Sequence, residues 1–313
     1  MDDAMVAQVR RFNRTITQRV GALDDHFLAL DRPLGQARVL WEIGDGCDVR
    51  SLRSRLDLDS GYVSRLLRSL EADGLITVGP SETDRRVRTA RLTPAGIAER
   101  RELDRRSDEL AASFLAPLDP EQRERLVAAM SDVERLLTAA LVEIAPIDPD
   151  QPDAQHCLWE YFAELNRRFD TGFEPGLSNL PDVADLRPPA GLLLVATLHA
   201  EPIGCGALRF HDGEPPDIKR MWVAGGARGL GIGRRLLREL ERHAAERGHT
   251  TVRLETNRAL SEAISMYRSA GYVEVAAFND ERYAHHWFEK DLTAPAEKLA
   301  SVSSDGRGSI EPG

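Results

Sequence analysis

The chain has 313 residues, enough for two domains of ordinary size. Charged residues make up 29% of it, its mean hydropathy is −0.36, and no apolar run approaches the ~18 residues that a membrane-spanning helix needs. The composition therefore predicts no membrane partner. The three cysteines, Cys47, Cys157 and Cys205, lack C-x-x-C spacing, so we expect a cytoplasmic protein without a metal site.

The first 145 residues are helical by pattern, apart from one interruption. Helices are predicted over 4–30, 34–44, 48–56, 59–73, 94–116 and 120–144. Between the fourth and fifth, G-L-I-T-V-G-P-S-E-T-D-R-R-V-R-T-A-R-L-T predicts two short strands around a polar turn. Short helices that lead into a β-hairpin indicate a mainly α winged helix-turn-helix domain.

The predicted helix that begins at Ser60 has two contrasting faces. Its apolar face carries Val63, Leu66, Leu67 and Leu70. Small polar and cationic groups of the other face suit base edges and phosphates in a major groove. We expect double-stranded DNA to contact Ser60, Tyr62, Ser64, Arg65 and Arg68. An ordinary solvated face for the arginines and a core position for Tyr62 are the alternatives.

The hairpin that follows carries a recognisable pattern. D-R-R-V-R-T-A-R-L-T-P-A-G is similar to the D-x-R-x-x-x-x-x-L-T-x-x-G of MarR-family regulators, at Asp84, Arg86, Leu92, Thr93 and Gly96. The resemblance spans residues 5 to 145. It implies that Arg86 enters the minor groove, that Asp84 holds the wing in shape, and that the terminal helices form a homodimer.

The formal net charge of −10 seems to oppose DNA binding. Locally the balance is reversed, because residues 50–91 contain nine arginines and six acidic residues, a net of +3. Electrostatic affinity depends on the charges that face phosphate. A basic surface on this domain therefore remains compatible with DNA.

Two segments have the composition of connectors. A-P-I-D-P-D-Q-P-D-A combines three prolines with three aspartates, so we expect a linker over 146–155 between a first domain over 1–145 and a second over 156–292. The segment 293–313 lacks aromatic residues and is rich in Ser, Gly and Ala, which predicts a disordered tail.

The second domain contains a glycine-rich turn between a strand and a helix. The strand I-K-R-M-W-V begins at Ile218, the turn A-R-G-L-G-I-G follows, and apolar residues then recur every fourth position from Ile232 to Ala244. Glycines at such a turn let backbone N–H groups approach an anion, and the helix dipole favours negative charge there. The pattern predicts a site for a phosphate-bearing cofactor.

Spacing within and after this turn is similar to the GNAT N-acetyltransferases. Arg228-x-x-Gly231-x-Gly233 matches the R/Q-x-x-G-x-G/A signature, and S-E-A-I-S-M-Y-R-S-A-G-Y is similar to the family's A-x-x-x-Y-x-x-x-G-[FY], with Tyr267 as its tyrosine. The resemblance covers residues 156 to 292. It implies an α/β fold with a mixed, splayed central sheet, and acetyl-CoA as co-substrate.

The resemblance also assigns roles. A plain tight turn and a core tyrosine are the alternatives for the turn and for Tyr267. The family implies that Asn257 touches the pantetheine arm and that Tyr267 protonates the departing thiolate. It implies that backbone groups of Met221, Trp222 and Val223 pair with the pantetheine amides, and that Arg228, Gly229, Leu230, Gly231, Ile232 and Gly233 bind pyrophosphate.

A base that removes a proton from an amine is harder to identify. Asp217 and Glu255 are the nearest carboxylates by the strand pattern. Both suit a structural ion pair with Lys219, Arg220 or Arg253 equally well.

Together these patterns predict a dimeric DNA-binding regulator fused to an acetyl-CoA-dependent N-acetyltransferase that acts on a primary amine. One rival is a transcription factor whose second domain only senses acetyl-CoA or an amine. Another is an enzyme whose winged helix serves only for dimerisation. The acceptor stays open among amino acids, small amines, antibiotics and protein lysines.

Overall fold

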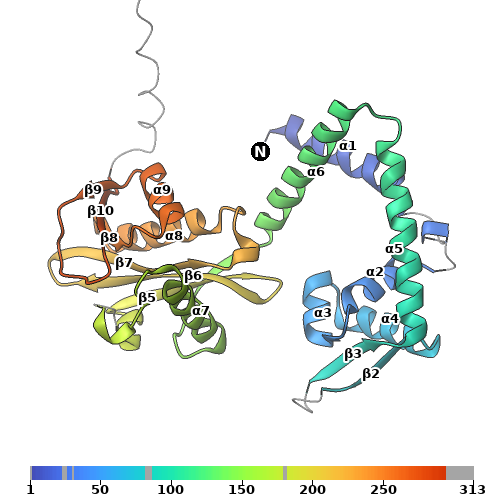
Figure 1. The fold of residues 1–313 in the computed structure, drawn as a ribbon, viewed down its shortest axis with the longest axis horizontal. Helices are drawn as coiled ribbons and strands as arrows, with labels where there is room; N and C mark the ends of the chain where they lie inside the picture. Colours follow the sequence, from blue (N-terminus) through green and yellow to red (C-terminus); the bar gives the residue numbers. More distant parts are fainter. Residues whose placement is uncertain (1, 23–26, 30–31, 82–86, 179–181, 294–313) are drawn as a thin grey trace, which may run out of the picture. The chain divides into compact units, whose positions relative to one another are not determined.

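The computed structural model describes residues 2–22, 27–29, 32–81, 87–178 and 182–293, and the chain divides into units over 1–132 and 133–313 (Figure 1). Asp84 and Arg86, the two wing residues of the MarR-like pattern, lie outside the described residues. Within the described part, no helix is long and apolar enough to cross a membrane.

The N-terminal unit is mainly helical, with one small sheet in the strand order β1-β3-β2. Both strand pairs are antiparallel, and Val78 of β2 lies opposite Ala90 of β3. Its elements are α1 (Asp3–Arg19), η1 (Phe27–Ala29), α2 (Leu34–Ile43), β1 (Cys47–Asp48), α3 (Val49–Leu56), α4 (Ser60–Ala72), β2 (Ile76–Pro80), β3 (Arg88–Leu92), α5 (Pro94–Leu115) and α6 (Pro120–Ala140).

The junction between β3 and α5 explains why the L-T-x-x-G pattern needs those residue types. Thr93 is the N-cap of α5, where its hydroxyl accepts from the Gly96 N–H at 3.1 Å and donates to the Gly74 carbonyl at 2.7 Å. A Cβ on Gly96 would lie 2.0 Å from the Leu75 carbonyl oxygen, so only glycine lets the helix approach the hairpin this closely.

Two predicted helices are shorter than expected. The first ends at Arg19, two residues before Gly21 at φ +66°, so the prediction to residue 30 was wrong. The last ends at Ala140 instead of 144, because Glu143 already belongs to a strand. Neither α1 nor α6 buries a residue within the described structure.

The C-terminal unit is built on a seven-stranded sheet in the order β4-β5-β6-β7-β8-β10-β9. All its strand pairs are antiparallel except β7 with β8, so the sheet is mixed as predicted. Its strands and helices are β4 (Glu143–Ile147), α7 (Pro152–Arg168), η2 (Pro175–Leu177), η3 (Val183–Leu186), β5 (Gly191–Leu198), β6 (Glu201–His211), β7 (Glu214–Val223), η4 (Gly225–Ala227), α8 (Ile232–Glu246), β8 (Thr251–Thr256), α9 (Ser261–Ser269), β9 (Val273–Val275) and β10 (His286–Asp291).

Helices cover both faces of this sheet. Figure 1 shows α7 on one side and α8 with α9 on the other. Leu236, Leu240 and Ile264 belong to the larger core on the α8 side, whereas Cys157 and Leu158 of α7 belong to the smaller core opposite. The two apolar layers leave the carboxyl end of β7 between α7 and α9.

The segment 146–155, which we expected to be a linker, instead contains the end of a strand and the start of a helix. Residues 143–147 form strand β4, which pairs with β5 from Glu143 opposite Thr197 to Ile147 opposite Leu193, and α7 begins at Pro152. The Arg235 guanidinium of α8 also donates to the carbonyls of Ala139, at 2.6 Å, and Val142, at 2.8 Å. Only 148–151 connect β4 to α7, so the second unit starts well before residue 156.

Candidate functional site

The glycine turn leads into α8 without a side-chain cap. Gly231 is the N-cap at φ +75°, and Gly229 lies at φ +84°. A Cβ added to either would meet no atom within 4 Å, so open space faces this turn. The first N–H groups of a helix have no partner within the helix, which makes the start of α8 suited to an anion.

Gly233 has a different reason to be glycine. A Cβ there would lie 3.1 Å from the Met266 sulfur, so a larger residue would push α8 and α9 apart. Leu230 packs its side chain against the core, and only its backbone belongs to the turn. The turn thus combines an open anion-binding part with one tightly packed position.

Strands β7 and β8 separate as the resemblance predicted. Their parallel register is recorded at one position of the described sheet, Asp217 beside Arg253. Further along, the β6–β7 register shifts between Cys205 and Ala207, and Arg220 of β7 has a φ of +55°. The Cys205 thiol donates to the Arg220 carbonyl at 3.3 Å. The shift is a β-bulge, which bends β7 near the position where it separates from β8.

A hollow of about 520 Å³ lies beside the turn. Eight of the residues expected to bind the cofactor line it: Met221, Trp222, Val223, Arg228, Gly229, Gly231, Ile232 and Gly233. The rest of the lining comes mainly from α7 and α9, and consists of Tyr161, Glu164, Leu165, Arg168, Ala227, Arg234, Leu260, Glu262, Ala263, Met266 and Tyr267.

Glu164 of α7 organises one wall of this hollow. Its carboxylate accepts from the Trp222 indole N–H at 3.1 Å and from the Arg228 guanidinium, and it pairs with Arg168 at 3.3 Å. Arg168 in turn lowers the pKa of Glu262 to about 2 by hydrogen bonding. Sequence reasoning missed Glu164 and Arg168; their i,i+4 spacing on one helix was the available signal.

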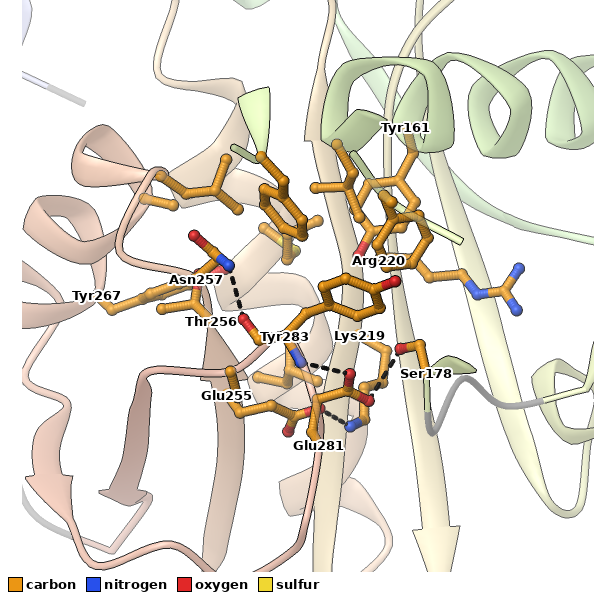
Figure 2. A pocket seen from close by; sticks show the side chains of 18 residues that line it. Tyr161, Ser178, Lys219, Arg220, Glu255, Thr256, Asn257, Tyr267, Glu281 and Tyr283 are labelled. Atoms are coloured by element: carbon orange, nitrogen blue, oxygen red, sulfur yellow. Dashed lines mark hydrogen bonds and ion pairs between the residues drawn. The ribbon is translucent and has the colours of Figure 1, made fainter. Parts of the chain in front are cut away.

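Figure 2 shows the side chains that line a second cavity, whose volume is about 90 Å³. Tyr161, Met221 and Tyr267 belong to the lining of both. The remaining wall contains aromatic and charged groups from β7, β8 and the segments around 169–178 and 281–284. Tyr267 therefore borders the point where the two cavities meet.

The Tyr267 phenol is held in its neutral form. Its side chain is 5% exposed, and burial, helped by the negative charge of Glu255, raises its pKa above the usual range for tyrosine. Among the described residues, none hydrogen-bonds its hydroxyl. A protonated phenol with an uncommitted O–H is suited to donate a proton.

Of the two carboxylates proposed as bases, Glu255 lines the smaller cavity. Its Oε1 pairs with the Lys219 ammonium, and both side chains are buried. Its Oε2 is buried and has no hydrogen-bond partner within the described structure. Such an atom costs free energy until it meets a donor, so a ligand N–H suits this position.

Asp217, the other carboxylate proposed as a base, lines neither cavity. Its carboxylate accepts from the Arg253 Nε at 2.6 Å, lies 2.9 Å from the His211 Nε2, and stands 3.8 Å from the Lys219 Nζ. These contacts hold a buried carboxylate between basic groups. Asp217 thus has the structural role that the sequence left as its alternative.

Asn257 lines the smaller cavity and is absent from the lining of the larger one. Its amide N–H donates to the Tyr283 carbonyl at 2.7 Å, and its oxygen accepts from the Ala259 N–H at 2.9 Å. The side chain therefore fixes the loop after β8 to the segment around Tyr283. Its proposed contact with the pantetheine arm remains a prediction.

The N-terminal unit presents the expected second surface on α4. Val63, Leu66, Leu67 and Leu70 are buried, and Asp59 caps the helix by accepting from the Tyr62 N–H at 2.9 Å. The opposite face, formed by Ser60, Gly61, Tyr62, Ser64, Arg65 and Arg68, is exposed.

Tyr62 supports this surface. It is 37% exposed, the Arg65 guanidinium lies 5.6 Å from its ring centroid, and its hydroxyl is near Gly35 of α2, where an added Cβ would lie 2.9 Å away. The Arg68 Nε donates to the Ser64 carbonyl at 3.1 Å, and the residue is exposed. No group of three or more His, Cys, Asp or Glu suited to a metal occurs among the described residues.

Comparisons with known proteins agree with both units. Residues 152–272 match the acetyltransferase (GNAT) family, and residues 30–87 match the MarR family. A protein named "IAA acetyltransferase" from Azospirillum brasilense is 32% identical over 125 residues, which cover 40% of this chain and 82% of that protein.

Solved structures similar to each unit are also known. A putative acyl-CoA N-acyltransferase from Klebsiella pneumoniae is 28% identical, with 49% of this chain and 99% of that chain covered and a TM-score of 0.41. A probable transcriptional regulator from Pseudomonas aeruginosa is 24% identical, with coverages of 41% and 98% and a TM-score of 0.36.

The protein is thus a two-domain fusion of a MarR-type regulator region with an acyltransferase, and the chain belongs to the GNAT acetyltransferase family. The family uses acetyl-CoA, and the MarR region implies DNA binding.

Proposed function

We propose that the C-terminal unit transfers an acetyl group from acetyl-CoA to a primary amine, and that the N-terminal unit binds double-stranded DNA as a homodimer. One observation carries the first part. The buried Tyr267 and the unpartnered Oε2 of Glu255 line the same small cavity, and Tyr267 also borders the larger hollow. A phenol that can donate a proton and a carboxylate oxygen that can accept one thus border the same small space, which supports the proposal.

The larger hollow fits the donor. Its volume of about 520 Å³ is within the range of small-molecule sites, and the uncapped start of α8 offers N–H groups to a pyrophosphate. Beyond Asp217 the edge of β7 is open toward β8, so backbone groups of Met221 and Val223 are available for amide pairing. The name of the Azospirillum relative supports acetyl as the transferred group.

When bound, acetyl-CoA supplies the thioester whose acetyl group is transferred. The amine nitrogen attacks the carbonyl carbon, a C–N bond forms, and the C–S bond breaks. Glu255 accepts the proton that the nitrogen loses, and Tyr267 donates its phenolic proton to the departing thiolate. Proton transfers of this kind typically contribute 10²–10⁴-fold each.

Turnover is the direct test. Purified full-length protein with acetyl-CoA and a panel of primary amines should release free CoA and form the acetylated amine, detected by mass spectrometry. Binding of acetyl-CoA and of an amine without any acetylated product would contradict the proposal and favour a sensor.

The role of Glu255 has a matched control in the same unit. Glu241 is also a buried carboxylate, pairs with Lys290 at 2.7 Å, and lines neither cavity. Glu255→Gln should lower kcat by about 10² or more, whereas Glu241→Gln should lower stability and leave kcat nearly unchanged. Equal effects of both changes on kcat would reduce Glu255 to a structural carboxylate.

The proposals that the protein binds DNA and forms a homodimer rest on the N-terminal unit. The exposed polar face of α4 carries two arginines, and the small sheet beside it resembles a wing. Exposed apolar side chains gather on α1 and α6, the helices expected to pair with a second copy. They are Met5, Val6, Val9, Phe12, Val127, Met130, Leu136 and Leu137.

A further inference from the structure

Three aromatic side chains besides Tyr161 and Tyr267 line the smaller cavity, and Figure 2 labels one of them, Tyr283. Phe169, Phe173 and Tyr283 come from segments far apart in the sequence, and all three line the cavity. The Phe173 and Tyr283 ring centroids are 4.9 Å apart, those of Phe169 and Tyr283 are 5.7 Å apart, and those of Phe169 and Phe173 are 5.8 Å apart. We call these three residues the aromatic wall.

Three charged groups of the cavity, Lys219, Glu255 and Glu281, already have hydrogen-bond partners. The Lys219 ammonium pairs with Oε1 of Glu255. The Glu281 carboxylate accepts from the Ser178 hydroxyl at 2.9 Å and from the Tyr283 N–H at 3.1 Å. Among the carboxylate oxygens that line the described cavity, only Oε2 of Glu255 is buried without a partner. One ligand N–H group therefore meets one acceptor, and a second ammonium would compete for oxygens already bonded.

The size of the cavity is also informative. Its volume is about 90 Å³, which is smaller than the apolar cavity of about 150 Å³ that holds one benzene molecule. A ring therefore also needs space beside Tyr267, where the cavity continues into the larger hollow, and a single planar ring on a short chain needs the least of it. Acceptors with several fused or linked rings exceed it.

We propose that the acetyl acceptor is an aromatic monoamine, with one ring against the aromatic wall and its single primary amine beside Glu255 and Tyr267. This rests on the acetyltransferase function proposed above. Ring edges and faces pack well on Phe and Tyr, so the wall contributes specificity, while Glu255 orients the nitrogen.

The test compares three amines on the full-length protein with saturating acetyl-CoA. These are 2-phenylethylamine, 2-cyclohexylethylamine, which has a saturated ring, and 1,5-diaminopentane, which has a second ammonium. We expect kcat/KM to be about tenfold or more higher for 2-phenylethylamine than for either of the others. Comparable values for diaminopentane or the cyclohexyl amine would overturn the proposed acceptor class while leaving amine acetylation intact. No acetylation of any amine would instead contradict the acetyltransferase function itself.

Single substitutions test whether the aromatic wall causes the preference for an aromatic acceptor. Phe173→Leu keeps an apolar side chain and should lower kcat/KM for 2-phenylethylamine about tenfold, mainly through KM, with little effect on diaminopentane. Phe210→Leu is the matched control, because Phe210 lines neither cavity and stacks on His249. The KM for acetyl-CoA reports whether Phe173→Leu disturbs the rest of the site. An equal loss for all three amines, with that KM unchanged, would show that the wall does not recognise a ring.

Discussion

Tyr267 and Tyr272 lie with their ring centroids 5.8 Å apart and 58° between their planes, but their hydroxyl groups have different surroundings. The Tyr272 hydroxyl donates to the buried Glu241 carboxylate at 3.0 Å, within the core. The Tyr267 hydroxyl borders the junction of two cavities and has no hydrogen-bond partner among the residues described. Neighbouring tyrosines thus serve packing in one case and, by our proposal, chemistry in the other.

Tyr267→Phe should lower kcat by about 10²–10⁴ and leave the Kd of acetyl-CoA nearly unchanged, because only the proton donor is lost. Tyr272→Phe is the control and should reduce stability with little change in kcat. Steady-state kinetics and calorimetry on both variants separate the effects. A wild-type kcat in Tyr267→Phe would leave Tyr267 as a packing residue.

Gly231→Asp should weaken acetyl-CoA binding while the fold survives, because the added Cβ has open space around it and aspartate is among the residues that adopt the left-handed φ of +75°. A carboxylate about 6 Å from a phosphate, at an effective dielectric of about 20, weakens binding by about 100-fold. Gly231→Asn keeps the size without the charge, and asparagine tolerates the left-handed conformation. Gly233 is a poorer position for this test because its Cβ would contact Met266. If calorimetry gives Asp and Asn variants the same affinity, the turn does not hold pyrophosphate.

The C-terminal unit should lose stability in alkali. Burial raises the pKa of Tyr161, Tyr267 and Tyr272, so each keeps its proton in the folded state above about pH 10, where the unfolded chain ionises. Their contribution is therefore complete below about pH 10 and is lost as pH rises, by up to about 1.4 kcal/mol per tyrosine at pH 11. Urea unfolding followed by tryptophan fluorescence measures this, since three of the four tryptophans lie in this unit. Tyr267→Phe should make the decline shallower; an unchanged slope would mean that Tyr267 ionises normally.

DNA binding should depend on the exposed face of α4. Arg65→Ala and Arg68→Ala should each weaken DNA binding. If the replaced arginine contacts one phosphate, the slope of log K for DNA against log salt concentration should become shallower by about 0.9. Arg65 should also affect sequence preference if it reaches base edges, and Arg86→Ala should weaken binding to all sequences. Arg242→Ala, an exposed arginine of α8, is the control for net charge. Gel shifts at several salt concentrations that show no change for Arg65, Arg68 and Arg86 would favour the scaffold alternative.

Dimer formation should depend on the apolar side chains of α1 and α6. Phe12 is 41% exposed, and Phe12→Glu should place a charge in the proposed interface and weaken self-association. Val273→Glu, at a residue of β9 that is 67% exposed, is the control and should leave the mass unchanged. Sedimentation equilibrium over a range of concentrations is the measurement. The same mass for both variants would exclude α1 from the interface.

Features with a local cause could be predicted from the sequence. The glycine turn, Tyr267 in a short helix and the two faces of α4 each depend on spacing within about a dozen residues, and the structure places them as expected. The choice between Asp217 and Glu255 could not be made, because both alternate with apolar residues in neighbouring strands. Contacts of Asp217 with Arg253 and His211, which depend on the folded sheet, favour a structural role for Asp217.

The missed features depend on pairing between distant segments. Glu164 becomes important only because Trp222 and Arg228 approach it from β7 and the turn. Strand β4 contains Pro146, so its composition was typical of a linker. A proline is tolerated there because β4 is an edge strand, where a missing N–H need not leave a ladder bond unmade.

Strand β4 also determines where the two units of this chain can be separated. The boundary between the two units lies inside α6, after Asp132, and the same run of chain continues into the edge of the acetyltransferase sheet. A fragment that begins at residue 156 would remove this edge and expose the backbone of β5, whose residues 191–196 are all buried. Unpaired apolar edges invite aggregation. A cut within the proline-rich segment therefore removes the first strand of the acetyltransferase sheet, which follows directly after the last helix of the regulator region.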